Sequence, residues 1–223
     1  MSAHPLTPPI VAPSILSADF SRLQTDLALV DPERDWIHCD VMDNHFVPNL
    51  TFGPIVIDAV RKLSRGYLDV HLMIEEPGKL VPAFRKAGAD GITIHLEACE
   101  DLAATLAAVK ESGARIGLAL KPGTPLAAAE PHLGDLDLLL LMTVEPGFGG
   151  QAFMSDMMPK VKEAVAWREQ HAARYLIEVD GGIAPDTAKV ARGAGAEIFV
   201  AGHAIYRQAN PQIALATLRD AVR

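Results

Sequence analysis

The chain has 223 residues, of which 49% are hydrophobic, and it carries a formal net charge of -8. This length is typical of one domain, and the apolar fraction is sufficient for a sizeable core. The negative charge argues against nucleic acid and anionic membranes as partners, because both attract a surplus of lysine and arginine. No apolar run approaches the roughly 20 residues that cross a bilayer.

Residues 1–9 form a proline-rich lead-in without a basic segment followed by an apolar one, so we expect no secretory signal. The two cysteines, Cys39 and Cys99, lie in apolar segments and lack the spacing of a metal site. We expect both to be buried, reduced thiols. Together these features predict a cytoplasmic protein.

Eight apolar runs of strand length follow one another along the chain, at 10–14, 36–41, 68–73, 91–96, 115–120, 138–144, 175–180 and 197–201. Capping residues, helical spacing of apolar residues or a glycine stop mark helices between them, at 17–30, 52–63, 79–90, 101–115, 186–197 and 210–223. Eight strands alternating with helices predict a parallel α/β protein. The length is close to the about 250 residues of a (β/α)8 TIM barrel. We therefore predict a single TIM-barrel domain over residues 1–223, with an open doubly wound sheet as the alternative.

Unusual polar residues cluster at the ends of the predicted strands. They are Ser14, His38, Asp40, His71, His95 and Asp180, with Lys121 directly after the fifth strand. In a barrel, the carboxyl ends of all strands meet on one rim, where active sites lie. A residue that only packs the core has no reason to prefer that end, so the clustering predicts an active site.

Four of these residues, His38, Asp40, His71 and Asp180, offer two imidazoles and two carboxylates. The period of two along a strand places His38 and Asp40 on one face. This mixed nitrogen and oxygen set suits one divalent zinc, iron(II), manganese or cobalt ion better than calcium or magnesium. The alternative is that each histidine only hydrogen-bonds a neighbouring acid.

Glycine-rich turns follow the last three predicted strands. Glycine permits backbone N–H groups to approach an anion closely, and the loops after the last strands of a barrel commonly bind phosphate. The sequence therefore predicts a phosphorylated substrate. The candidate residues are Gly147, Phe148, Gly149, Gly150, Gly181, Gly182, Gly202 and His203.

The remaining candidates near the rim have simpler interpretations. We assign His95 a structural role and Lys121 the start of a loop before proline. On the residues alone, Met42, Met73 and Met142 are ordinary packing residues.

The segments "HCDVMDNHFVPNLTFGP", "DVHLMIEEP", "HLEA", "LALKPGTP", "TVEPGFGGQ" and "EVDGGI" resemble the ribulose-phosphate 3-epimerase family. The resemblance extends over essentially all eight predicted strands, and the H-x-D-x-M-D block followed by F-V-P-N is highly specific. It implies a TIM barrel that interconverts D-ribulose 5-phosphate and D-xylulose 5-phosphate in the pentose-phosphate pathway. It also implies a homo-oligomer, because the family forms dimers and hexamers.

The resemblance also implies roles for individual residues. It implies that His38, Asp40, His71 and Asp180 bind one divalent metal, and that Asp40 and Asp180 are the catalytic acid–base pair. Ser14, His71 and the backbones of 147–150 and 181–182 would contact the substrate. Met42, Met73 and Met142 would surround the reacting carbons.

Two positions depart from the family pattern. Asn44 stands where members usually carry glycine, and His203 stands where they usually carry serine. Asparagine tolerates left-handed backbone geometry, so we expect the first departure to change only a turn. The second replaces a small hydroxyl donor at the phosphate site with an imidazole.

Epimerisation inverts one carbon beside a ketone, so a proton leaves one face and another arrives on the opposite face. Two carboxylates flanking a planar enediolate meet this requirement. The nearest alternative function is a sister epimerase acting on allulose 6-phosphate. A barrel decarboxylase or aldolase generally needs a lysine within a strand, and the second and third predicted strands have none. A non-catalytic phosphate- or metal-binding barrel is the third alternative.

Overall fold

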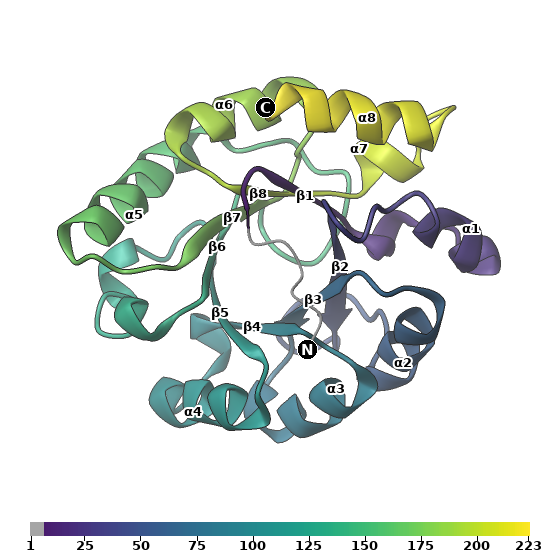
Figure 1. Cartoon of the computed structure of the whole chain (residues 1–223). Coiled ribbons are helices and arrows are strands. Elements are labelled where there is room, and N and C mark those ends of the chain that lie inside the picture. Colours follow the sequence, from purple (N-terminus) through teal and green to yellow (C-terminus); the bar gives the residue numbers. More distant parts are fainter. Residues whose placement is uncertain (1–6) are drawn as a thin grey trace.

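Eight parallel strands form the centre of the protein in a computed structural model that describes residues 7–223. The strands are β1 (Ile10–Pro13), β2 (Trp36–Met42), β3 (Tyr67–Met73), β4 (Gly91–His95), β5 (Arg115–Leu120), β6 (Leu138–Met142), β7 (Leu176–Asp180) and β8 (Ile198–Ala201). They are ordered β1-β8-β7-β6-β5-β4-β3-β2, and a parallel bridge between Ser14 and His38 closes the ring (Figure 1). The predicted TIM barrel is confirmed, and the open doubly wound sheet is wrong.

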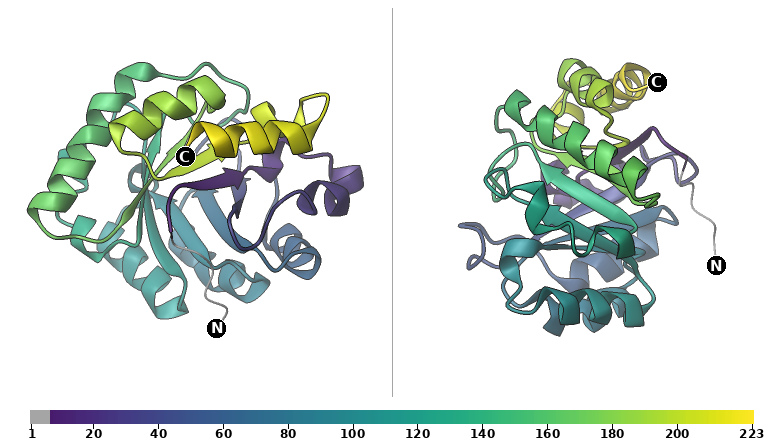
Figure 2. Two further views of the ribbon diagram at one scale, coloured as in Figure 1. Left: turned by 45° about the horizontal axis from the view of Figure 1, so that its top comes forward. Right: turned by 90° about the vertical axis from the view of Figure 1, so that its left-hand side faces the viewer.

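Helices surround the barrel on its outer side (Figures 1 and 2). They are α1 (Leu23–Leu27), α2 (Pro54–Leu63), α3 (Val81–Ala87), α4 (Leu102–Ser112), α5 (Met158–Gln170), α6 (Pro185–Ala194), α7 (His203–Tyr206) and α8 (Pro211–Ala221). Of the predicted lead-in over 1–9, residues 1–6 lie outside the described part. Among the described helices, none is long and apolar enough to cross a membrane.

The helix pattern differs from the prediction in several places, and α5 and α7 lie in none of the predicted helix ranges. Between β5 and β6 the chain forms two short 3-10 helices, Leu126–Ala128 and Leu133–Asp135, instead of an α-helix. Three prolines in this segment remove backbone donors that an α-helix would need. The predicted helix over 17–30 is also broken, because 3-10 turns precede the short α1.

The alternation of side chains along each strand divides the core into two parts. Outward residues such as Ile37, Cys39 and Val41 are buried against the helices. Inward residues fill the barrel, and its amino-terminal end is apolar, with the rings of Trp36 and Tyr67 stacked 4.2 Å apart. Because the period is two, the same alternation directs the polar residues further along β2 into the interior.

Both cysteines are free thiols, as expected. Cys39 is buried, and burial raises the pKa of its thiol. Cys99 is only half-buried, so the prediction of full burial is wrong for this residue.

The barrel interior has no room for an added methyl group where β4 and β5 pair at Thr93 and Gly117. A Cβ at position 117 would lie 2.9 Å from the Cα of the buried Thr93. We expect Gly117→Ala to lower the free energy of unfolding by about 1–3 kcal/mol, because overpacking forces side chains and backbone to shift. Chemical denaturation measures the loss. Gly123→Ala is the control, since no atom lies within 4 Å of its added Cβ, and equal stabilities of the two variants would contradict the prediction.

Candidate active site

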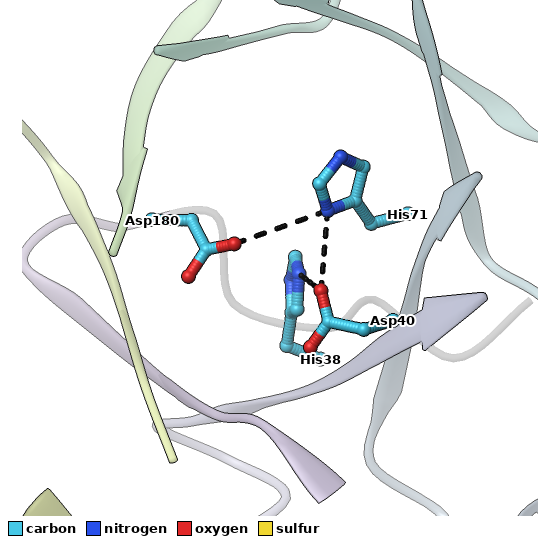
Figure 3. A group of neighbouring side chains, drawn as sticks. All are labelled: His38, Asp40, His71 and Asp180. Carbon is cyan, nitrogen blue, oxygen red and sulfur yellow. Dashed lines mark hydrogen bonds and ion pairs between the residues drawn. The ribbon is translucent and has the colours of Figure 1, made fainter. Parts of the chain in front are cut away.

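Four predicted ligand side chains converge inside the barrel near the carboxyl ends of β2, β3 and β7 (Figure 3). The strand register places Asp40 beside His71. His38, Asp40, His71 and Asp180 each offer one ligand atom, and these atoms lie within 4.8 Å of one another. The structure therefore brings together all four residues that the sequence selected.

Asp40 is the most heavily bonded member of the cluster. Its Oδ1 lies 3.2 Å from His38 Nε2 and 3.3 Å from His71 Nδ1. Its Oδ2 accepts a hydrogen bond of 2.5 Å from Ser14 Oγ. Burial raises the pKa of Asp40, but the charge and hydrogen bond of His38, followed by those of His71, outweigh burial and hold the pKa well below its usual range. Asp40 is therefore ionised.

Asp180 has the opposite electrostatic character. Its Oδ2 lies 4.0 Å from His71 Nδ1, on the other side of the cluster from Asp40 (Figure 3). Burial, reinforced by the negative charge of Asp40, raises the pKa of Asp180 to about 7. Two neighbouring carboxylates in a low dielectric resist simultaneous ionisation. Positive charge between the two carboxylates would relieve this repulsion.

The protonation of the histidines tests whether the cluster fits a metal ion. Burial lowers the pKa of His38, but the charges of Asp40 and Asp69 outweigh burial and raise it well above its usual value. His38 therefore binds a proton where a metal ion could bind instead. Metal binding commonly releases such protons. Two imidazoles and two carboxylates are also ligands that divalent transition metals accept. The buried cluster could hold a metal ion.

The structure adds two acids that the sequence analysis missed, Asp69 and Glu178. Asp69 Oδ2 lies 2.7 Å from His38 Nδ1, and Glu178 Oε1 lies 3.7 Å from the same nitrogen. Both acids are wholly buried, and burial together with the charge of Asp69 raises the pKa of Glu178. The signal was present in the sequence, because each acid stands two residues before a selected residue and so faces the same way.

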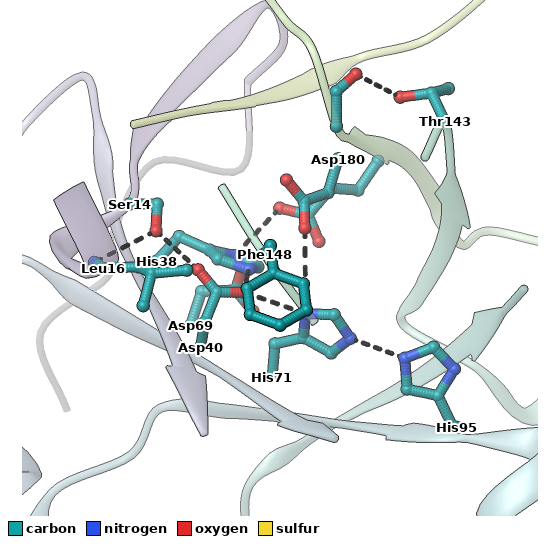
Figure 4. Close-up of polar contacts among 12 residues, drawn as sticks. Ser14, Leu16, His38, Asp40, Asp69, His71, His95, Thr143, Phe148 and Asp180 are labelled. Carbon is teal, nitrogen blue, oxygen red and sulfur yellow. Dashed lines mark hydrogen bonds and ion pairs between the residues drawn. The ribbon is translucent and has the colours of Figure 1, made fainter. Parts of the chain in front are cut away.

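His95 is also closer to the site than its structural assignment suggested. Its ring is wholly buried, and its Nε2 lies 2.9 Å from His71 Nε2 (Figure 4). No pairing partner for this histidine could be predicted from the sequence, because the contact joins β3 to β4.

A pocket opens over the cluster and is lined by the predicted substrate-binding turns. Its lining includes Ser14, Asp40, Met42, Met73, Met142, Gly147, Phe148, Gly149, Gly150, Asp180, Gly181, Gly182, Gly202 and His203. His71, predicted to contact the substrate, is wholly buried and is not among the lining residues. The three methionines are buried as well as lining the pocket.

The turn after β7 requires its two glycines. Gly181 and Gly182 have φ values of 123° and 65°, a region that L side chains rarely adopt. Added Cβ atoms would lie 2.8 Å from the Val144 nitrogen and 2.7 Å from the Phe153 Cα. Thr143 Oγ1 donates to the Gly181 carbonyl at 2.7 Å and so holds the turn in place (Figure 4).

Two further loops meet at this pocket. Asn49 Nδ2 donates to the Gly147 carbonyl at 2.7 Å, which ties the loop after β2 to the loop after β6. A Cβ on Gly150 would lie 3.4 Å from His203 Cδ2, so the loop after β6 also approaches α7. Asn44 has a φ of 60°, the left-handed geometry expected for it.

Asp43 directly follows β2 and has a structural role instead of a place in the cluster. Its Oδ1 accepts the backbone N–H groups of His45 at 2.8 Å and Phe46 at 3.0 Å, and its Oδ2 accepts that of Glu75 at 2.8 Å. Burial raises the pKa of Asp43, but these three N–H groups outweigh burial and lower it. Asp43 therefore ties together the loops after β2 and β3.

We expect Asp43→Ala to lower the free energy of unfolding by about 1–3 kcal/mol, because three backbone donors lose their acceptor. Because folding lowers this pKa, the stabilisation is fully present above the ordinary carboxyl value of about 3.9 and is lost as pH falls through the folded-state value. Denaturation at several pH values measures both effects. Asp58→Ala, at an exposed pair with Lys62, is the control; a loss at Asp43 no larger than this control would contradict the assignment.

Fold and site together define a TIM-barrel protein with a buried histidine and aspartate cluster beneath a glycine-lined pocket. The model of the ribulose-phosphate 3-epimerase family matches residues 10–206. The chain belongs to this family, and the predicted family and its class of activity, an isomerase, are confirmed.

Individual relatives agree with the family match. The chain is 49% identical to the ribulose-phosphate 3-epimerase of Bacillus subtilis over 211 residues, which cover 94% of this chain and 97% of the relative. It is 46% identical to that of Synechocystis over 217 residues, covering 96% and 94%. The crystal structure of KGPDC from Streptococcus mutans matches with a TM-score of 0.72 at 17% identity, covering 97% of this chain and 98% of that one. At that identity the structural likeness shows the fold alone.

Proposed function

We propose that this chain is a metal-dependent 3-epimerase that interconverts D-ribulose 5-phosphate and D-xylulose 5-phosphate. The convergence of Asp40 and Asp180 on one pocket carries the proposal. They come from β2 and β7 and approach from opposite sides of the cluster (Figure 3). Two acids in this arrangement can serve the two faces of a planar intermediate.

His38, Asp40, His71 and Asp180 would hold one divalent zinc, iron(II), manganese or cobalt ion. When bound, the ion supplies positive charge that stabilises the oxyanion developing on the substrate. The support for this assignment is the converging donor set and the repulsion between its two carboxylates.

Asp40 takes the proton from C3 of ribulose 5-phosphate, because its ionised carboxylate faces the pocket. Its two oxygens have different neighbours, with Oδ1 against the histidines and Oδ2 against Ser14. These contacts fix the orientation of the carboxylate. The electron pair of the broken C–H bond enters a planar enediolate.

Asp180 delivers a proton to the opposite face of C3, which gives xylulose 5-phosphate. The raised pKa of its carboxyl group supports this role, because environments that separate the pKa values of two acids commonly divide the acid and base functions between them. The two roles exchange in the reverse reaction.

Met42, Met73 and Met142 line the same pocket and are almost fully buried. Methionine offers a polarisable surface without a transferable proton. We assign these side chains to the wall around the reacting carbons, where they exclude water without competing with the two aspartates.

The substrate phosphate binds at the glycine turns of 147–150 and 181–182 and at Gly202 and His203. The positive φ values at both turns leave backbone N–H groups accessible to an anion, which supports this placement. Ser14 and His71 are assigned further substrate contacts by family resemblance, and for Ser14 the pocket lining supports the assignment.

We further propose that residues 1–223 form one domain that works in the cytoplasm as a homo-oligomer, a dimer or a hexamer. The cellular location is supported by the rice relative, which is named a cytoplasmic isoform of ribulose-phosphate 3-epimerase and is 44% identical.

His203 supports a second candidate, an epimerase of allulose 6-phosphate, because an imidazole at the phosphate end of the pocket changes the space for a longer sugar. A lysine-dependent decarboxylase or aldolase is disfavoured, since no lysine lines this pocket among the described residues. A non-catalytic barrel has no need for two aspartates with widely separated pKa values facing one pocket.

Asp180→Asn tests the two-base scheme. We expect epimerisation to fall by about 10²–10⁴-fold, because the amide cannot deliver the second proton. Asp40 should still exchange the C3 proton of ribulose 5-phosphate with deuterated solvent, which proton NMR of the recovered substrate detects. Asp186→Asn, at a side chain 99% exposed, is the control and should keep full activity. Full turnover by Asp180→Asn would exclude the scheme.

An epimerase assay on ribulose 5-phosphate, with metal analysis of the same sample, tests the whole proposal. We expect about one divalent ion per chain, loss of activity after chelation and recovery when zinc, iron(II), manganese or cobalt is added. Undiminished activity in protein free of metal would contradict the metal role. Faster turnover of allulose 6-phosphate than of ribulose 5-phosphate would replace the proposed substrate with the six-carbon one.

A further inference from the structure

The two nitrogens of His71 face different surroundings. Nδ1 lies 3.3 Å from Asp40 Oδ1 and 4.0 Å from Asp180 Oδ2, within the candidate metal cluster. Nε2 lies 2.9 Å from Nε2 of His95, and both rings are wholly buried. A neutral imidazole carries one hydrogen, and a nitrogen that binds a cation must offer its lone pair. For Nδ1 to face a cation, the hydrogen of His71 must therefore lie on Nε2.

That requirement determines the hydrogen position on the next ring. If His71 Nε2–H donates, Nε2 of His95 must accept, so the hydrogen of His95 lies on Nδ1. This nitrogen is 3.2 Å from Glu97 Oε2, a suitable acceptor.

Glu97 can end the chain because it is a well-held carboxylate. Its Oε1 accepts the backbone N–H of Lys121 at 2.8 Å and the hydroxyl of Thr124. Burial raises the pKa of Glu97, but the hydrogen bonds from His95, Thr124 and Lys121 outweigh burial and lower it to about 2. The ring of Phe46 lies 4.9 Å from that of His95, centroid to centroid, and limits its movement.

We propose that His95 and Glu97 are positioning residues, a hydrogen-bond relay that directs the Nδ1 lone pair of His71 into the metal cluster. This inference rests on the proposed function. It assigns a role to two residues that touch neither the substrate pocket nor the cation.

The other ligand histidine shows why a relay of two steps is needed. His38 lies beside Asp69 in the strand register, and its Nδ1 bonds that acid directly at 2.7 Å. On the side of its Nε2, His71 lies beside Thr93 in the register with β4, so no carboxylate is adjacent on that side. His95, two residues further along β4, spans the distance to Glu97. Each ligand imidazole is thus held through its far nitrogen by a chain that ends in a carboxylate, an arrangement that orients ligands in metal sites.

Two substitutions at position 95 separate the relay from simple packing. In His95→Gln, the amide oxygen can accept from His71 Nε2–H while the amide N–H donates to Glu97, so the direction of both bonds is preserved. In His95→Leu, both bonds are lost. We expect the dissociation constant for Mn²⁺ or Zn²⁺ alone, from competition with a chelator, to rise about 10–100-fold in His95→Leu and to stay within a few-fold of wild type in His95→Gln.

Glu97→Ala provides a second test of the relay, because it removes the terminal carboxylate. The Glu97 side chain is 19% exposed, so its removal disturbs packing less than a change at the wholly buried His95. It should weaken metal binding in the same direction. His171→Leu is the control, since His171 is exposed and belongs neither to the cluster nor to the pocket lining. Thermal denaturation of every variant verifies folding.

A spectroscopic readout tests the direction of the relay. In zinc-loaded protein, long-range ¹H–¹⁵N correlation should show the hydrogen of His71 on Nε2 and that of His95 on Nδ1 in wild type, and a mixture of His95 tautomers in Glu97→Ala. Wild-type affinity in a folded His95→Leu, no rescue by His95→Gln, or a His95 hydrogen on Nε2 in wild type would overturn the proposal. If the wild-type chain binds no metal, the metal role of the proposed function fails, whereas a wild type that binds zinc no more tightly than folded His95→Leu overturns the relay alone.

Discussion

The burial of carboxylates inside the barrel is the constraint on which the rest of the structure depends. Ionised groups removed from water are costly unless opposite charge and hydrogen bonds compensate them. Asp40 receives that compensation from Ser14 and two histidines, and Asp69 receives it from His38. Asp180 has less, so its carboxyl group holds a proton more tightly. The unequal compensation of two acids at one pocket makes them chemically different.

Inward-facing side chains form successive layers along the barrel axis, and these layers make the arrangement possible. At its amino-terminal end, stacked Trp36 and Tyr67 close the interior with apolar rings. Asp69 and Glu178 form the next layer, two residues further along β3 and β7. Asp40 and Asp180, which face the pocket, form the layer after that. The period of two along parallel strands generates the sequence of layers. The polar layer lies where an apolar core would otherwise continue, which indicates that it serves chemistry and not stability.

The same fold occurs in proteins whose sequences differ greatly from this one. KGPDC of Streptococcus mutans matches over 97% of the chain at only 17% identity. A barrel supports many activities because strands and helices hold the frame while the residues at the strand ends can change. The family is therefore established by sequence, whereas the chemistry depends on which side chains the frame brings together.

The sequence by itself determined the strands, the barrel, the four converging residues and the glycine turns, because each depends on periodicity or on the polarity of strand ends. Tertiary structure alone decided the contacts between strands. His95 meets His71 across β3 and β4, and Glu97 reaches Lys121 after β5. Local pattern specifies which face a residue occupies, but only closure of the barrel specifies which residue lies opposite.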